Sequence, residues 1–339
     1  MPEPNIYLLL LIIVLAMCFG FTNGLNDAAN AIATAIGTRA LSPRAAVILA
    51  GVFNFAGAAT GLEVARTIGK GILSPDAVTY VTMISALASV IIWTAFATYR
   101  GLPVSLTHGF VVALAAAGIA SVGVDAVSWG VMGRVMSAVI TAPLLGFTGG
   151  FALMVGLYWV FRRSAPDMMR SLFSKLQIPA AAFVAYAHGK NDGQMPVGII
   201  TMALVVYYHD TSLWDRLSIT NPDLWWVIAL SALSISSGMS IGGRRVIKTV
   251  GMKVTSLSPI NGFTAQAAAA AVIEGASHLG IPVSTTHCVT SSIMGVGSTM
   301  RFSAVRWGIA GNIVTAWVLT FPICGALGYL FSWILHSLL

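Results

Sequence analysis

Long stretches without a charged side chain constrain this sequence more than any other feature. A helix needs about 20 consecutive apolar residues to cross the hydrocarbon of a bilayer. Backbone polar groups must be satisfied within the membrane, so such stretches are expected to be helices. Charged residues are only 9% of the chain, too few to cover a water-soluble protein of 339 residues. The sequence therefore predicts an all-α polytopic membrane protein, with seven stretches that qualify: 5–26, 45–62, 77–99, 135–161, 224–243, 254–273 and 307–335.

The charges between these stretches predict which ends of the helices face the cytoplasm. Basic residues gather in two segments, 162–175 and 244–253, which are expected on the cytoplasmic side. Segment 209–223 carries three Asp and one Arg and is expected on the other side. The net charge of +7 is thus interpreted as topology, and no nucleic-acid partner is expected. Residues 1–5 contain no basic residue, so the first stretch is expected to remain as a helix.

An internal duplication is visible in three landmarks that recur in the same order. The segment GLPVSLTH at 101–108 returns as GIPVSTTH at 280–287, with six of eight positions identical. GLND at 24–27 returns as GKND at 189–192, and a Trp-Gly pair followed by Thr-x-Pro closes both halves. Such self-similarity indicates two copies of one unit. We predict a transmembrane repeat at 1–161, a basic cytoplasmic linker at 162–178, and a second transmembrane repeat at 179–339.

Each repeat is expected to combine an interrupted helix with a re-entrant hairpin. The long first helix is interrupted by Asn-Asp, and Gly24 and Gly189 could unwind it there to free carbonyl oxygens. Residues 104–124 and 283–300 are rich in Ser, Thr and Gly, and each is expected to form two half-helices. Non-helical backbone at membrane depth is tolerated only where protein or water satisfies it. The Ser-x-Thr-His sequences are therefore placed at hairpin tips in a water-lined cavity.

Asp27 and Asp192 are the strongest chemical signal in the sequence. A carboxylate at the centre of a membrane helix costs roughly 2.5–3.5 kcal/mol, so it normally marks an ion path or a buried partner. Asn26 and Asn191 add a neutral oxygen beside each carboxylate. The four residues are candidate cation ligands, and the two Asp are the candidate metal ligands for Na⁺ if transport is sodium-coupled. The alternative is that each Asp only pairs with a basic residue, and Lys190 adjoins Asp192.

The two Ser-x-Thr-His sequences are the second signal. Ser105 with Thr107, and Ser284 with Thr286, place hydroxyl pairs directly after Pro, where a helix can begin. Free N–H groups and the helix dipole at such an end attract an oxyanion, so two tips could close on one tetrahedral anion. The alternative is that these hydroxyls merely cap a helix. His108 and His287 close the motifs and could contact the anion, sense protons, or only hydrogen-bond the hairpin.

These residues together resemble those of the PiT family of inorganic phosphate transporters. The resemblance rests on residues 24–38 and 67–72, the paired Gly-x-Asn-Asp motifs and both PVSxTH segments, and it covers nearly the whole chain. It implies a cation–phosphate symporter with inverted repeats and a site near the membrane midplane. The family's cation site would fall at Asn26, Asp27, Asn191 and Asp192. Its phosphate site would fall at Ser105, Thr107, Ser284, Thr285 and Thr286.

The function expected is therefore secondary active transport of inorganic phosphate with a cation, Na⁺ being favoured over H⁺. A permease for sulfate or another tetrahedral oxyanion is the nearest alternative, and an anion channel is a more remote one. An enzyme is not expected, because no nucleophile–base pair or metal-ligand spacing is present. No cofactor is expected besides the coupling ion. The lipid bilayer of a prokaryotic plasma (inner) membrane is the expected location, and a homodimer is left open.

Overall fold

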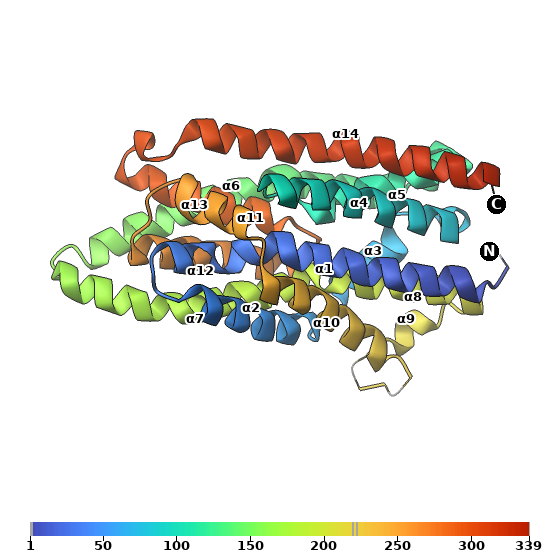
Figure 1. Cartoon of the computed structure of the whole chain (residues 1–339), viewed down its shortest axis with the longest axis horizontal. Helices are drawn as coiled ribbons and strands as arrows, with labels where there is room; N and C mark the ends of the chain where they lie inside the picture. The colour runs from blue at the N-terminus through green and yellow to red at the C-terminus, as the bar shows by residue number, and fades with distance from the viewer. Residues whose placement is uncertain (1–2, 219, 222, 339) are drawn as a thin grey trace.

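The computed structural model describes residues 3–218, 220–221 and 223–338, and it is all-α as expected. Within that part, the only β-type pairing is an isolated bridge between Leu73 and Val127. The longest helices lie along one axis of the molecule (Figure 1). They are α1 (Ile6–Gly37), α6 (Trp129–Val160) and α14 (Trp307–Leu338), of 32 residues each. At 1.5 Å per residue each is about 48 Å long, enough to cross a bilayer even when tilted.

The same order of elements occurs twice along the chain. In the first half α1 is followed by the bent pair α2 (Pro43–Ala58) and α3 (Glu63–Gly71), then α4 (Tyr80–Arg100), α5 (Leu106–Val122) and α6. In the second half α7 (Pro166–Asp192) and α8 (Gln194–Tyr208) take the place of α1. The rest are α9 (Leu213–Arg216), the bent pair α10 (Trp225–Ile241) and α11 (Arg244–Lys248) with the π-helical turn Thr249–Lys253, α12 (Pro259–His278), α13 (Thr285–Met300) and α14. Short 3₁₀ turns lie at Pro75–Ala77, Val124–Ala126 and Phe302–Ala304.

The segment predicted as a linker, 162–178, lies mostly in α7. This helix continues without a break through Pro179 to Asp192. Likewise, α6 is one uninterrupted helix despite Pro143. Among the described residues, four helices are long and apolar enough to cross a membrane alone, and the two bent pairs could raise that number to six.

The equivalent helices α1 and α7–α8 run in opposite directions. Thr38, just after α1, donates a hydrogen bond to Gln177 in the first half of α7, at 2.7 Å. Figure 1 shows α1 passing from right to left while α7 and α8 pass from left to right. An antiparallel relation between equivalent helices is what an inverted repeat requires.

The two ends of the molecule differ in charge. Arg39, Arg170 and residues 257–260 line one cavity, so the ends of α1, the start of α7 and the start of α12 share one end. Gly251 packs on Gly37 at the same end, which places segment 244–253 there as well. The acidic segment around α9 lies at the opposite end (Figure 1). The two basic segments thus share an end, as the charge rule predicts for a cytoplasmic face.

The hairpins are built differently from the sequence-based expectation. Residues 104–124 and 283–300 do not each contain two half-helices, because α5 and α13 are single helices. Instead α4 pairs with α5, and α12 pairs with α13. Gly101 and Gly280 turn the chain at the tips with φ of +73° and +64°, a conformation that favours glycine. The tip of the first hairpin reaches Asn26, well inside α1, so it ends part-way along the long helix rather than at its end.

The sequence predicted that Gly24 and Gly189 unwind their helices. The structure shows that they do not. Residues 6–37 are helical throughout, and α7 stays helical to Asp192. A Cβ on Gly24 would lie 1.9 Å from the carbonyl oxygen of Ile235 in α10, and one on Gly189 would lie 2.1 Å from that of Asn54 in α2. Because glycine has no side chain, the helix backbones can come into contact at these two positions, which is the usual role of small residues between membrane helices.

The hairpins pack mainly on long helices of the opposite repeat. In the first hairpin, Trp93 donates a hydrogen bond to Thr320 of α14 at 2.9 Å, and Ser332 of α14 donates to the carbonyl of Ala117 in α5. In the second hairpin, Gly295 of α13 lies against the backbone of Phe147 in α6. The long closing helices α6 and α14 are thus exchanged between the repeats.

Candidate functional site

Asn26 and Asn191 tie the hairpin tips to the long helices of their own repeats. The Asn26 amide donates to the carbonyl of Leu102 at 3.2 Å and accepts from the N–H of Val104 at 3.3 Å. The Asn191 amide donates to the carbonyl of Val283 at 2.7 Å and accepts from the N–H of the same residue at 3.4 Å. The two predicted cation ligands therefore satisfy backbone groups that a helical hydrogen-bond pattern leaves open.

Asp27 and Asp192 instead contact the hairpin of the other repeat. Asp27 accepts hydrogen bonds from Thr286 at 2.8 Å and from Thr285 at 3.3 Å. Asp192 accepts one from Thr107 at 2.6 Å. All five side chains are buried. The carboxylates and the tip hydroxyls that were predicted as two separate ligand sets thus meet in one cluster.

His188 lies between the two carboxylates and was not identified from the sequence. Its Nε2 is 3.5 Å from Oδ2 of Asp27 and 3.5 Å from Oδ2 of Asp192. Its Nδ1 lies 2.6 Å from the amide of Asn54. The spacing of four residues to Asp192 is a helical signal for a shared face. The equivalent position of the first repeat is Asn23, so the comparison of the repeats hid this residue.

The basic residue beside Asp192 does not neutralise it. Lys190 pairs with Glu274 of α12 and lies 3.2 Å from the ring of His278. The interpretation in which Lys190 serves as the partner of Asp192 is therefore wrong. Among the residues that the structure describes, the titratable nitrogen nearest to both carboxylates belongs to His188.

Asn30 completes the oxygen-rich side of the cluster and was also missed. Its amide nitrogen donates to Thr286 at 3.0 Å and to Thr285 at 3.2 Å, while its oxygen is buried with no hydrogen-bond partner among the described residues. Asp27, His188 and Asp192 each offer a ligand atom within 4.8 Å of the others. Carboxylate, hydroxyl and amide oxygens in such a group suit a small hard cation.

Ser105 and Ser284 cap the helices that begin at the tips. Ser105 accepts from the N–H of His108 at 3.2 Å, and Ser284 accepts from the N–H of His287 at 3.1 Å. The capping role that was the alternative interpretation is therefore present. Capping uses each hydroxyl only as a hydrogen-bond acceptor, so the hydroxyl hydrogen of Ser284 can still be donated to another acceptor. The Ser105 hydroxyl also lies 3.1 Å from Nδ1 of His108.

His108 and His287 lie behind the tips rather than among the carboxylates. Their ring centroids are 5.2 Å apart, and the His287 ring lies tilted by 31° against that of Trp317, with 4.0 Å between the two centroids. Both rings are buried, and within the described residues the two ring nitrogens of His287 and Nε2 of His108 have no hydrogen-bond partner.

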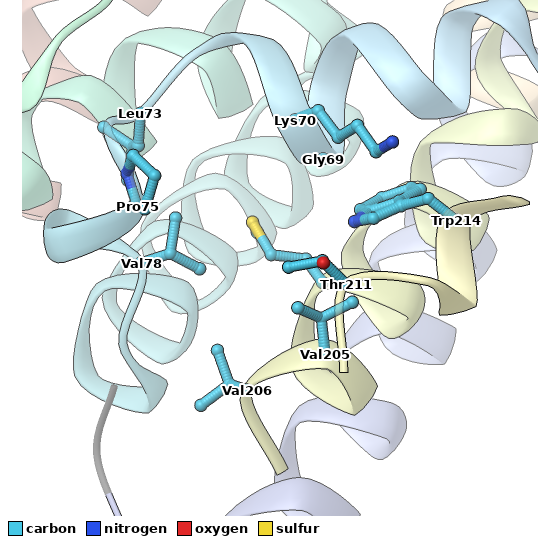
Figure 2. Close-up of a pocket in the computed structure, with 10 residues that line it drawn as sticks. Gly69, Lys70, Leu73, Pro75, Val78, Val205, Val206, Thr211 and Trp214 are labelled. Carbon is cyan, nitrogen blue, oxygen red and sulfur yellow. The ribbon is translucent and has the colours of Figure 1, made fainter. Parts of the chain in front are cut away.

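A separate apolar cavity of about 240 Å³ lies away from this cluster, between α3, α8 and α9 (Figure 2). Its walls include Val78, Val205 and Val206, and at its edge Lys70 lies 5.7 Å from the ring centroid of Trp214. No candidate ligand of the cluster lines this cavity.

Comparison with known proteins finds similarity to phosphate transporters over nearly the whole chain. The profile of the phosphate transporter family matches residues 23–328. A probable low-affinity inorganic phosphate transporter of Bacillus subtilis (strain 168) is 40% identical over 333 residues, which are 98% of both chains. One from Rhizobium meliloti (strain 1021) is 40% identical over 316 residues, covering 93% of this chain and 92% of that one. A solved structure described as the sodium-dependent phosphate transporter superposes with a TM-score of 0.88 at 26% identity, covering 98% of this chain and 100% of that one.

Proposed function

This chain belongs to the phosphate transporter family, and we propose that it carries inorganic phosphate across the membrane in symport with Na⁺. It is an inorganic phosphate transporter and not an enzyme. The observation that carries the coupling proposal is the crossed pairing of Asp27 with Thr286 and of Asp192 with Thr107. Two carboxylates from different repeats are thereby held in one buried cluster, where a cation would compensate their charge.

Na⁺ fits the donor atoms of this cluster better than a proton does. The carboxylate oxygens, the threonine hydroxyls and the free oxygen of Asn30 are neutral or negative oxygen ligands, which a dehydrated Na⁺ needs in number. A proton needs a single titratable oxygen and would leave the rest without a purpose. The sodium dependence named for the solved relative supports the same choice.

Phosphate would be held by the hairpin tips, next to the cation cluster. Helices α5 and α13, of 17 and 16 residues, begin at Ser105 and Ser284, and their first turns carry the threonines that touch the aspartates. The positive ends of both helix dipoles therefore converge on the cluster. We assign the anion to Ser105, Thr107, Ser284, Thr285 and Thr286, with His108 and His287 supporting the tips from behind.

The location follows from the charges and the relatives. We place the basic end of the molecule in the cytoplasm and the protein in the plasma (inner) membrane of a prokaryote. Bacterial relatives support this placement. A homodimer stays a prediction.

Uptake into proteoliposomes tests the proposal. Labelled phosphate uptake should require an inward Na⁺ gradient at equal pH, saturate with Na⁺, and concentrate phosphate above equilibrium, as a channel could not. Excess sulfate should compete weakly. Full uptake driven by a pH gradient with choline in place of Na⁺ would overturn sodium coupling. Strong competition by sulfate would move the substrate assignment to a broader class of oxyanions.

A further inference from the structure

A groove of about 730 Å³ opens at the basic end of the molecule, beside the last turn of α1. We call it the basic groove. It is formed by the end of α1, the start of α2, the end of α10, and α11 with the turn after it. Its lining residues are Ile36, Ser42, Pro43, Arg44, Val47, Ile241, Arg244, Ile247, Lys248 and Met252.

The walls of the basic groove are apolar. Ile36, Val47 and Ile247 are half-buried, and Ile241 and Met252 are 62% and 50% exposed. Large aliphatic side chains this exposed at a helix end are expected to meet hydrocarbon in a membrane protein. The groove therefore offers a surface for an alkyl chain rather than for water.

Three basic side chains line the groove together with these apolar residues. Arg44, Arg244 and Lys248 are exposed, and none of them forms an ion pair within the part of the chain that the structure describes. No acidic residue lines the groove. Lys70, at the edge of the apolar cavity between α3, α8 and α9, by contrast lies 4.0 Å from a carboxylate oxygen of Asp215.

The position of the groove along the helices fixes the kind of ligand. Gly37 packs against Gly251 beside it, at the end of the molecule that carries the basic segments. With that end in the cytoplasm, as proposed above, the groove would face the head groups of the cytoplasmic leaflet, where basic pockets between membrane helices bind acidic head groups.

We propose that the basic groove binds an anionic phospholipid, with its phosphate on Arg44, Arg244 and Lys248 and an acyl chain along Ile36, Val47, Ile241 and Met252. Free phosphate would leave the apolar walls exposed to water. A second copy of the chain would bring another set of unpaired cations to the same place. A lipid satisfies both the charge and the apolar surface.

A bound lipid would join α2 to α11 across the groove. Both helices belong to bent pairs, since α2 precedes the 65° turn into α3 and α11 follows the 59° turn from α10. The lipid would therefore hold together two bent pairs that belong to different repeats, without contacting the substrate cluster.

Lipid titration of the full-length protein in neutral detergent tests the proposal, with the shift of the thermal unfolding midpoint as the signal. The probe is dioctanoyl-phosphatidylglycerol, compared with dioctanoyl-phosphatidylcholine and with inorganic phosphate. The variant Arg44→Gln/Arg244→Gln/Lys248→Gln removes the groove cations. The matched control Arg163→Gln/Lys175→Gln/Arg301→Gln removes three exposed cations outside the groove.

We expect the parent and the control to bind phosphatidylglycerol equally. The groove variant should bind it on the order of 100-fold more weakly, because each basic residue at a membrane surface contributes about fivefold. Equal loss in the control, equal binding of phosphatidylcholine, or displacement by inorganic phosphate would overturn the proposal. Should the triple variant not fold, Arg244→Gln alone should weaken binding about fivefold, and an unchanged affinity would be decisive against the site.

Discussion

Thr286 donates a hydrogen bond to Asp27 over 2.8 Å, although 259 positions separate the two residues in the chain. Thr107 and Asp192 repeat this relation in the other direction, at 2.6 Å. Each carboxylate is thus completed by the hairpin of the opposite repeat, while each Asn binds the hairpin of its own. A displacement of one repeat against the other would change both Asp–Thr contacts together.

The crossed pairs predict matching effects of two distant substitutions. Thr107→Val and Thr286→Val keep the shape of the side chain and remove a hydrogen bond to a charged group, which contributes about 1.5–3 kcal/mol. We expect each to raise the Na⁺ concentration for half-maximal phosphate uptake by roughly 10- to 100-fold. Thr315→Val, which removes only a bond within exposed α14, is the control. Two unequal effects, one of them negligible, would argue against a shared cation site.

Neutralising either aspartate should abolish cation-driven uptake. Asp27→Asn and Asp192→Asn keep the size of the side chain but remove the charge that a coupling cation would compensate. We expect correctly folded protein, judged by gel filtration, with uptake at background. Asp125→Asn, in the short turn before α6, should transport as the parent does. Parental uptake with unchanged cation dependence in either variant would make that aspartate structural.

The serine caps predict a combined loss of stability and phosphate affinity. Ser105→Ala with Ser284→Ala removes two N-caps, each contributing about 0.5–2 kcal/mol. If the hydroxyls also bind phosphate, its affinity should fall by several kcal/mol in addition. Replacement by Thr, which can still cap, should restore stability in the same protein. A stability loss with unchanged phosphate affinity would limit both serines to capping.

His188→Asn introduces the residue that the first repeat has at the equivalent position. The variant removes the ring that lies 3.5 Å from both carboxylates. We expect at least tenfold slower uptake together with an altered dependence on Na⁺ concentration. Without the imidazole ring between them, the Asp27 and Asp192 carboxylates are no longer held at a fixed distance from each other. His336→Asn, near the end of α14, is the control. Slower uptake with the parental Na⁺ dependence would indicate a packing role alone.

Gly24→Ala should disrupt the contact between α1 and α10. The added Cβ would lie 1.9 Å from the carbonyl oxygen of Ile235, a backbone atom that cannot turn away. Overpacking typically costs 1–3 kcal/mol, so we expect a lower unfolding midpoint in detergent. Gly311→Ala, where a Cβ meets nothing within 4 Å, should leave the midpoint unchanged. Equal midpoints for both variants would refute the close approach.

The sequence predicts the class of fold and the chemistry of the cluster because both depend on local residue types. Charge-free stretches define helices, and a carboxylate among apolar residues indicates a site wherever it occurs. The partner of each carboxylate could not be predicted, since nothing in either motif states which repeat supplies the threonine. Gly24 was misinterpreted because glycine serves equally to unwind a helix and to let two helices touch. The hairpin limits were wrong because an apolar helix that ends part-way along α1, such as α4, has the composition of one that crosses a membrane.

The exchange of α6 and α14 between the repeats has a consequence for biosynthesis. Helix α5 packs along α14, which leaves the ribosome roughly 200 residues after α5 itself. At about 5–20 residues per second, the first hairpin would remain without its main neighbour for some ten to forty seconds. The packing of the nascent first repeat is therefore incomplete until α14 has been synthesised. A chain that stops before Trp307 would leave α5 packed on α4 but without its main neighbour, so a truncation in the second repeat would loosen the packing of the first.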